Sequence, residues 1–404
     1  MKKTIGLFIP STISYSETFF SSKVSGLEKS GFTVIIYCSK GNKQSNDFQY
    51  CYQRTLPKNS LIRLIKVILT ITEVIFKSPS RSLRLFKFNK KNNRSLINNL
   101  EILFTNAHVL IGPKIDYIHF GFATMGIGRE GLGKALKAEV STSIRGYDIG
   151  IYPIQHPNCY NTLWENLDKL HTISDDLLRL AINDGLKEST TVKKIPPAIN
   201  TKKFPVKNSA SFFDKKEIKI VTVGRLAWKK GYEYALQAIR LLKDANIEIK
   251  YTIIGQGDGF ERINFARHQL GLTNEVELLG KVNHELVPEI LLDHDIYLQP
   301  SIQEGFCNAV LEAQAMGLLC VVTDAEGLPE NVIHNKTGWV VPKRNPEAIA
   351  NRIKAISNLS SEDLIMISNT AQKRVRQEFN LEIQQQRFAS FFNNFGSPSK
   401  KENH

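Results

Sequence analysis

Two periods of hydrophobic positions alternate along the chain. Short runs of apolar and largely β-branched residues are separated by longer segments in which apolar residues recur at helical spacing. Strands that are buried on both faces give such continuous runs, and helices between them connect parallel strands. The pattern therefore predicts an α/β protein with parallel sheets.

The same alternation occurs once in each half of the chain. The first half is predicted to form strands at 4–9, 33–38, 109–111, 117–119, 138–144 and 167–173, with a helix from Asp175 or Asp176. The second half is predicted to form strands at 218–223, 249–254, 276–279, 296–299, 321–323 and 338–341, with helices at 232–242 and 259–270. We expect two doubly wound, Rossmann-like domains that face each other across a cleft, with ligand sites at the carboxyl ends of the strands.

The segment between the two series is rich in helix breakers. Residues 195–200 read IPPAIN and cannot be helical, and the polar residues 200–216 are the best candidate for a linker. The expected domains are an N-terminal domain, a C-terminal domain, a helix that packs back on the N-terminal domain, and a disordered tail. Their expected bounds are 1–205, 206–378, 379–396 and 397–404.

The composition is that of a packed globular protein. The 404 residues are 42% hydrophobic and 23% charged, with a net charge of +14. No apolar run reaches the roughly 18 residues of a membrane-spanning helix, and the start of the chain is too short in apolar residues for a signal peptide. Five cysteines without a Cys-x-x-Cys pair predict buried free thiols and no structural zinc site. We therefore expect a reducing, cytoplasmic location and no bound metal.

The positive charge is concentrated in the first half. Residues 1–200 hold 27 basic and 15 acidic side chains, and the window 58–94 holds ten basic residues and one acid, Glu73. In this window Arg63, Lys66, Arg81 and Arg84 are interleaved with leucine and isoleucine. Such a helix could bury its apolar side while its cations meet anionic headgroups, which predicts peripheral contact with an anionic membrane. A solvated basic face on a core helix is the alternative, and nucleic acid is not expected because no nucleic-acid-binding motif accompanies the charge.

The strongest candidate for chemistry is the segment PSIQEGFCNAVLEA at 300–313, which follows a predicted strand and opens a helix. Its first helical amides, near Asn308 and Ala309, are unpaired donors suited to a phosphate. Glu312 on the same helix could bind a diol such as ribose, and Glu304 lies nearer the group that the phosphate carries. Two glutamates around a helix start can equally be capping and surface charge, so the segment alone leaves both interpretations open.

A second candidate, GRLAWKKG at 224–231, also follows a predicted strand directly. Its two glycines bracket a tight loop that brings Arg225 and Lys230 to the end of the sheet. A guanidinium fork and a point charge together fit a diphosphate, although solvated loop cations are the alternative. The glycine loop GQGDG at 255–259 is a weaker signal, because a plain strand-to-helix turn explains it equally well.

The order of these motifs resembles one known family. Residues 218–353 are similar to the C-terminal domain of retaining nucleotide-sugar glycosyltransferases of family 4, which have the GT-B fold. The shared segments are VGRLAWKKG, IIGQGDG, VELLGKV, PSIQEGFCNAVLEAQAMG, TDAEGLPENV and NKTGWVV. The N-terminal half more loosely resembles members that build exopolysaccharide, capsule or O-antigen chains, through residues 16–19 and the stretch 143–148.

This resemblance implies a reaction. A sugar would be transferred with retention, and without a metal or other cofactor, from a UDP- or GDP-linked donor to a lipid-linked or polysaccharide acceptor. The acceptor would bind the N-terminal domain and the donor the C-terminal domain, at the inner face of the cell membrane.

The resemblance also assigns roles to residues. Arg225 and Lys230 would bind the donor diphosphate, Glu304 the donor sugar near the reacting carbon, and Glu312 the ribose. The remaining donor contacts would come from the amides of Asn308 and Ala309 at the distal phosphate, from Lys281 and Val282 along the base, and from Gly305 and Phe306.

Two positions depart from the family. Arg145 stands where the family commonly has a histidine close to the donor sugar and acceptor. An arginine stays protonated and cannot act as a general base, but it could add a cation beside the leaving diphosphate. The double-glycine loop that is common after the first strand is replaced by SYSE at 14–17.

Arg145 keeps a second class of function open, a non-catalytic member that binds nucleotide sugar or glycan. The intact Arg225, Lys230, Glu304 and Glu312 argue against this alternative. A nicotinamide-dependent dehydrogenase fits worst, since the first strand lacks a Gly-x-Gly-x-x-Gly turn. Among the histidines, His119 is predicted to be a satisfied core or turn residue. His284, His294 and His334 are predicted to lie at the surface.

Overall fold

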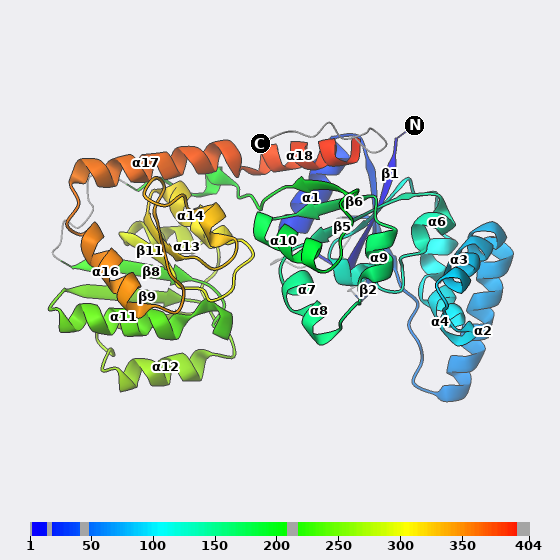
Figure 1. Cartoon of the computed structure of the whole chain (residues 1–404), viewed down its shortest axis with the longest axis horizontal. Helices are drawn as coiled ribbons and strands as arrows, with labels where there is room; N and C mark the ends of the chain where they lie inside the picture. The colour runs from blue at the N-terminus through cyan, green and yellow to red at the C-terminus, as the bar shows by residue number, and fades with distance from the viewer. Residues whose placement is uncertain (1, 14–17, 41–47, 208–216, 394–404) are drawn as a thin grey trace. The chain divides into compact units, whose positions relative to one another are not determined.

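The computed structural model describes residues 2–13, 18–40, 48–207 and 217–393, and the chain divides into two compact units. The first unit combines Met1–Ile195 with Gln385–His404, and the second is Pro196–Gln384. Each unit is built on its own parallel sheet with helices around it (Figure 1). The predicted α/β class with two Rossmann-like sheets is confirmed.

The sheet of the first unit has seven strands in the order β3-β2-β1-β4-β5-β6-β7. These strands are β1 (Thr4–Ser11), β2 (Thr33–Lys40), β3 (Tyr50–Tyr52), β4 (Tyr117–Phe120), β5 (Glu139–Ile144), β6 (Lys169–Thr172) and β7 (Thr191–Lys194). All neighbouring strands pair in parallel. The strand order reverses between β1 and β4, and in such sheets ligands bind at the carboxyl ends beside the reversal.

Helices pack around this sheet, and three of them form a separate group. They are α1 (Thr18–Lys29), α2 (Ser60–Lys77), α3 (Pro79–Lys91), α4 (Leu96–Thr105), α5 (Ala107–Leu110), α6 (Leu132–Leu136), α7 (Tyr147–Gly150), α8 (Tyr152–Gln155), α9 (Asn161–Glu165), α10 (Asp175–Asn183), η1 (Ala123–Gly126) and α18 (Leu381–Asn393). In Figure 1, α2, α3 and α4 lie together next to α6. Phe388, Phe391 and Phe392 of α18 belong to the same hydrophobic core as β1, β2 and α1.

The second unit has a six-stranded parallel sheet in the order β10-β9-β8-β11-β12-β13. Its strands are β8 (Ile218–Val223), β9 (Ile249–Ile254), β10 (Val276–Gly280), β11 (Ile296–Gln299), β12 (Leu319–Thr323) and β13 (Trp339–Val341). Its helices are α11 (Tyr232–Asp244), α12 (Phe260–Gln269), α13 (Val287–Leu292), α14 (Asn308–Met316), α15 (Leu328–Asn331), α16 (Pro346–Ile356), α17 (Ser361–Glu378), η2 (Thr201–Lys203) and η4 (Trp228–Lys230). Here the order reverses between β8 and β11.

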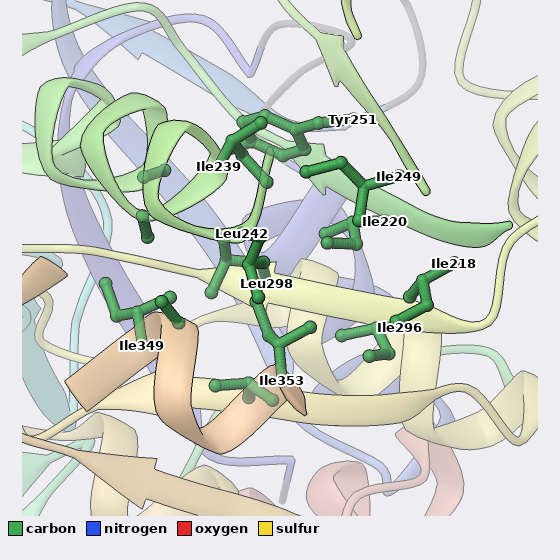
Figure 2. Close-up of a cluster of buried hydrophobic side chains, with 14 of the residues drawn as sticks. Ile218, Ile220, Ile239, Leu242, Ile249, Tyr251, Ile296, Leu298, Ile349 and Ile353 are labelled. Carbon is green, nitrogen blue, oxygen red and sulfur yellow. The ribbon is translucent and has the colours of Figure 1, made fainter. Parts of the chain in front are cut away.

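The core of the second unit forms where two helices cover one face of this sheet. Figure 2 shows Ile239 and Leu242 of α11 and Ile349 and Ile353 of α16 against side chains of β8, β9 and β11. Because these residues recur at helical spacing in α11 and α16 and in alternation on the strands, each element presents one apolar face to the same interior. This packing fixes the strands whose ends carry the candidate site.

Three expectations about elements need correction. Residues 109–111 are helical, in α5 and its carboxyl cap, because a short apolar run does not distinguish a strand from a buried helical turn. Strands β3 and β7 were missed, since one has three residues and the other reads TVKK.

The predicted domain boundary at 205 and 206 falls inside the second unit. Phe204 is buried there, the Lys207 ammonium lies 2.9 Å from Asp295 Oδ1, and the Lys207 amide donates to Met316 O. Residues 208–216 of the candidate linker, residues 394–396 of the predicted last helix and the predicted tail lie outside the described residues.

Candidate active site

The loops that follow β8 and β11 meet at the reversal of strand order in the second unit. Gly231 has φ of +64°, and a Cβ atom there would lie 2.1 Å from Pro300 O. The Ile302 amide donates to Lys229 O at 2.7 Å. A glycine is therefore required for the two loops to touch, and their contact places the candidate residues of both loops together.

Lys230 and Glu304, one from each loop, form an ion pair. Both side chains are 12% exposed. Burial lowers the pKa of Lys230, but the charge and hydrogen bond of Glu304, together with Cys307, raise it, so that the pKa lies above its ordinary value. The pair thus concentrates a fixed cation and a fixed carboxylate at the carboxyl end of the sheet.

A third loop, after β12, holds Glu304 from the other side. The Glu304 amide donates to Glu326 Oε2 at 2.6 Å, and the Gly327 amide donates to Glu304 O at 2.9 Å. A Cβ atom on Gly327 would lie 1.9 Å from Gly305 O, so this approach also requires a glycine. Glu326 had no predicted role, although its segment, TDAEGLPENV, is one of those that resemble the family.

The amino terminus of α14 is free of side-chain caps. Its N-cap residue, Cys307, makes no capping hydrogen bond, and Asn308 is exposed. Asn331 fixes the start of the helix, since its Oδ1 accepts from the Cys307 amide and its Nδ2 donates to Cys307 O, both at 3.0 Å. The first amides, including those of Asn308 and Ala309, are thus positioned at the positive end of a helix dipole, which suits a phosphate.

Glu312 lies further along α14 and is buried. Its Oε1 is 3.3 Å from Nε2 of His284, which lies in the loop after β10. The hydrogen bond to Glu312 raises the pKa of His284 above its ordinary value, while burial opposes this. His284 is exposed as predicted, but its contact with a candidate ligand-binding carboxylate was not foreseen.

An open cavity of about 600 Å³ lies beside these loops. It is lined by Arg225, Gln256, Gly257, Asp258 and Lys281. The GQGDG loop does more than turn the chain, because it packs backbone to backbone on the Arg225 loop. A Cβ atom on Gly255 would lie 1.9 Å from Gly224 O, and one on Gly257 would lie 2.5 Å from Leu226 O.

The second unit therefore carries all but one of the predicted site residues. Phe306 is buried, with its ring 5.6 Å from that of Phe379, so that only its backbone is available to a ligand. Gly305 and Val282 are half-buried next to Glu304 and Lys281 in sequence. Arg145 belongs to the first unit, where it follows β5.

Arg145 lies close to a group of buried basic side chains that includes Lys23 and His119. Its guanidinium is 3.6 Å from the centre of the Phe19 ring, and burial lowers its pKa to about 10. His119 is fully buried and lies within hydrogen-bonding distance of Ser141, Ser143 and Lys23, which confirms the prediction of a satisfied core histidine. Burial lowers the pKa of Lys23 well below its ordinary value, and the charge of Arg145 adds to this effect.

Other sequence-based predictions had mixed outcomes. His294 is buried between Ile290 O and Thr252 Oγ1, so its predicted surface position is wrong, whereas His334 is exposed. All five cysteines are free, but Cys51 and Cys159 are only half-buried. Within the described part of the chain, no three His, Cys, Asp or Glu side chains form a group that could hold a metal ion.

The basic window does not form the ordinary core helix that was the alternative interpretation. Helix α2 exposes much of its apolar surface, and the exposed side chains are those of Leu61, Ile62, Leu64, Ile65, Ile68, Leu69, Ile75 and Phe76. Two of the cations that were predicted to bind lipid headgroups instead donate to backbone carbonyl groups of the protein. Arg81 donates to Leu110 O and Gly112 O, and Arg84 donates to Ala135 O. No helix in the described ranges is both long and apolar enough to cross a bilayer.

The chain is similar to known proteins over most of its length. A family model described as Glycosyl transferases group 1 matches residues 204–374. The putative colanic acid biosynthesis glycosyltransferase WcaL of Escherichia coli (strain K12) is 27% identical over 410 residues, covering 96% of this chain and 98% of that protein. The amylovoran biosynthesis glycosyltransferase AmsK of Erwinia amylovora is 30% identical over 278 residues, or 67% of each protein.

Solved structures agree on the fold. Sucrose-phosphate synthase from Thermosynechococcus elongatus superposes with a TM-score of 0.71 at 17% identity, over 98% of this chain and 100% of that one. Anabaena HepE, solved in complex with UDP and glucose, gives a TM-score of 0.70 at 14% identity, over 97% and 100%. Two Rossmann-like units of this kind make up the GT-B fold. The chain belongs to the group 1 glycosyl transferases.

Proposed function

We propose that this glycosyltransferase moves a sugar, with retention and without a metal, from a UDP- or GDP-linked donor to a lipid-linked or polysaccharide acceptor in cell-surface polysaccharide synthesis. The observation that carries the proposal is the convergence of Arg225, Lys230, Glu304, Glu312 and the α14 amides at one end of the second sheet. The names of WcaL and AmsK support an exopolysaccharide product, and UDP in the HepE structure supports a nucleotide-linked donor.

In this proposal the protein's own cations replace a metal at the diphosphate. Lys230 and Arg225 stabilise the negative charge that grows on the leaving diphosphate, and the amides of Asn308 and Ala309 bind its distal phosphate. Because these groups are fixed by the loop contacts around Gly231 and Gly327, they need little reorganisation during the reaction.

The other parts of the donor, which are its sugar, ribose and base, are assigned to the remaining residues. Glu304 contacts the sugar near the reacting carbon, where positive, oxocarbenium-like charge develops. Glu312 accepts from the ribose hydroxyls, and Lys281 and Val282 lie along the base beside the cavity that also contains Arg225. Arg145 adds a further cation beside the diphosphate in the proposed mechanism.

We place the enzyme at the inner face of the cell membrane, where a lipid-linked acceptor would be found. The support is the exposed apolar face of α2 together with the exposed cations Lys58, Arg63, Lys87, Lys90 and Lys91. Glu73, the acid of this window, is paired with Arg54 and Lys77. An exposed apolar helix face, with exposed cations on the same segment and on α3, fits an anionic lipid surface, with insertion of α2 side chains as the main contact.

The experiment that tests the proposal measures turnover. Thermal shifts with UDP-, GDP- and ADP-sugars identify the donor, since a ligand at 100 times its Kd stabilises by roughly 2.7 kcal/mol. Transfer to a lipid-linked acceptor pool is then followed, and the anomeric configuration of the product is read by NMR. A retained anomer, formed in the presence of EDTA, is the expected result. Donor binding without turnover would instead favour the non-catalytic, glycan-binding alternative that Arg145 suggests.

A further inference from the structure

One contact at the candidate donor site joins two elements that are far apart in sequence. The Nε2–H of His284, in the loop after β10, donates to Oε1 of Glu312 on α14 at 3.3 Å. The Glu312 side chain is 11% exposed and that of His284 is 57% exposed. Within the described part of the chain, His284 is the one side chain that bonds to this carboxylate, which leaves its second oxygen available to a ligand.

We propose that His284 is a positioning residue for the nucleotide, which holds the Glu312 carboxylate toward the ribose diol and adds a positive charge beside the bound anion when it is protonated. This inference rests on the proposed function, in which Glu312 binds ribose. A carboxylate on a flexible side chain loses rotamer freedom when it binds, and a bond that already orients it reduces that loss. His284 thus positions Glu312 and, when charged, attracts the anion without contacting it, so it is distinct from the residues that contact the diphosphate.

The surroundings of His284 determine how its charge responds to pH. It faces Glu312 from α14, Lys203 from η2 and Glu285 in its own loop, and its ring lies 6.4 Å from that of Phe204. Glu312 and Glu285 favour the charged imidazolium, whereas burial and Lys203 disfavour it, with a net rise in pKa above the ordinary value of 6.5. The cation is therefore present below pH 6.5 and is lost as the pH rises through the raised pKa. A neutral ring still donates its Nε2–H, so the positioning bond weakens but persists at higher pH.

The test compares variants that separate the bond from the charge. UDP, with GDP in parallel, is titrated calorimetrically into the full-length protein at pH 6.0 and pH 8.5. His284→Ala removes both bond and charge, whereas His284→Gln keeps an N–H donor without a charge. His334→Gln is the matched control, because His334 is also exposed and its Nδ1 accepts only a backbone amide bond, from Val340.

The expected pattern is specific to positioning. His284→Ala binds more weakly at both pH values, by about 3- to 10-fold, as for the loss of one hydrogen bond. His284→Gln matches the wild type at pH 8.5 but lacks its gain in affinity at pH 6.0. The phosphate of the nucleotide itself titrates at about pH 6. His284→Gln lacks the imidazole and reports this contribution alone, whereas His334→Gln keeps His284 and should match the wild type at both pH values.

Each contrary outcome overturns a defined statement. Wild-type affinity in His284→Ala at both pH values overturns the inference, provided that circular dichroism shows a folded protein. Weaker binding in Glu312→Ala without any effect in His284→Ala overturns the role of His284 alone. If the wild type binds neither UDP nor GDP, the proposed donor site fails and the inference fails with it.

Discussion

The ammonium of Lys230 and the carboxylate of Glu304 form an ion pair that connects the loop after β8 to the loop after β11. In the proposed reaction these two groups meet adjacent parts of the same donor, Lys230 the diphosphate and Glu304 the sugar. A donor that enters the site must therefore share or replace their contact. Each charge holds the other in position before the donor binds, so the site is electrostatically preorganised for the ligand.

Replacing Lys230 by alanine is expected to affect both turnover and stability. Loss of a fixed cation at the leaving group lowers turnover by roughly 100- to 1,000-fold. The Glu304 carboxylate, left largely buried without its partner, also lowers the free energy of unfolding, by up to roughly 3 kcal/mol. Steady-state turnover and urea unfolding measure the two effects.

The control is Lys229→Ala, since the bond that Lys229 makes to the neighbouring loop comes from its backbone carbonyl, which accepts from the Ile302 amide. Near-wild-type turnover in folded Lys230→Ala would remove Lys230 from the site.

Arg225 is expected to behave differently, because its side chain is exposed at the edge of the cavity. Arg225→Ala should lower turnover strongly while the urea midpoint stays unchanged. Arg225→Lys should recover only part of the activity, since an ammonium lacks the planar fork that binds two phosphate oxygens. Full activity in Arg225→Ala would mean that this cation is merely solvated.

The histidines of the first unit predict an acid-sensitive fold. His119 and His171 are both fully buried, and burial lowers the pKa of each well below its ordinary value. Below about pH 6.5 the unfolded chain binds protons that the folded chain does not, so stability falls as the pH falls. Each histidine contributes a slope of up to about 1.4 kcal/mol per pH unit. Urea unfolding between pH 5.0 and 7.0 should show this slope, reduced in His119→Gln by the share of one histidine. Burial also lowers the pKa of His108, to about 4, and that of His294, so both contribute as well. A stability that is flat over this range would contradict neutral buried histidines.

Membrane contact is expected to depend on apolar side chains more than on cations. Leu64→Gln with Ile68→Gln replaces two residues of α2 that are 57% and 55% exposed, so the fold should be unaffected while binding to anionic vesicles is lost. Arg63→Gln should weaken binding only modestly, at ~1 kcal/mol per cation, and added salt should reduce that part.

Co-sedimentation with phosphatidylserine-containing vesicles measures both changes. Arg81 and Arg84 are unsuitable for this comparison, because their replacement would free buried carbonyl groups of the first unit. Equal pelleting of wild type and the double variant, both folded by circular dichroism, would mean that α2 is not a membrane contact.

The fold was largely predictable, because strands buried in parallel sheets leave continuous apolar runs. Loops after such strands could also be assigned chemistry, since their position at a sheet end is fixed by the topology. The exceptions have physical reasons. The apolar run at 109–111 is too short for its hydrophobic period to distinguish a helix from a strand. Strand β7 is polar and lies at the edge of the sheet.

Contacts between loops could not be predicted in the same way. The bond between His284 and Glu312 depends on how the loop after β10 approaches α14, and that distance has no periodic signature. The role of Glu326 similarly depends on the close approach of Gly327 to Gly305. The apolar pattern of α2 was visible in the sequence, but a pattern alone does not say which face is covered.

The central claim, a nucleotide-sugar site on the second unit, is tested most directly by titrating UDP and GDP into the wild type and Glu312→Ala. Glu289→Ala, at an exposed acid on α13, is the control. We predict that either UDP or GDP binds the wild type, and that the same nucleotide binds Glu289→Ala with equal affinity. Its affinity for Glu312→Ala should fall by roughly 1.5–3 kcal/mol, because the ribose loses a charged hydrogen-bond acceptor. Unchanged affinity in folded Glu312→Ala would contradict the site.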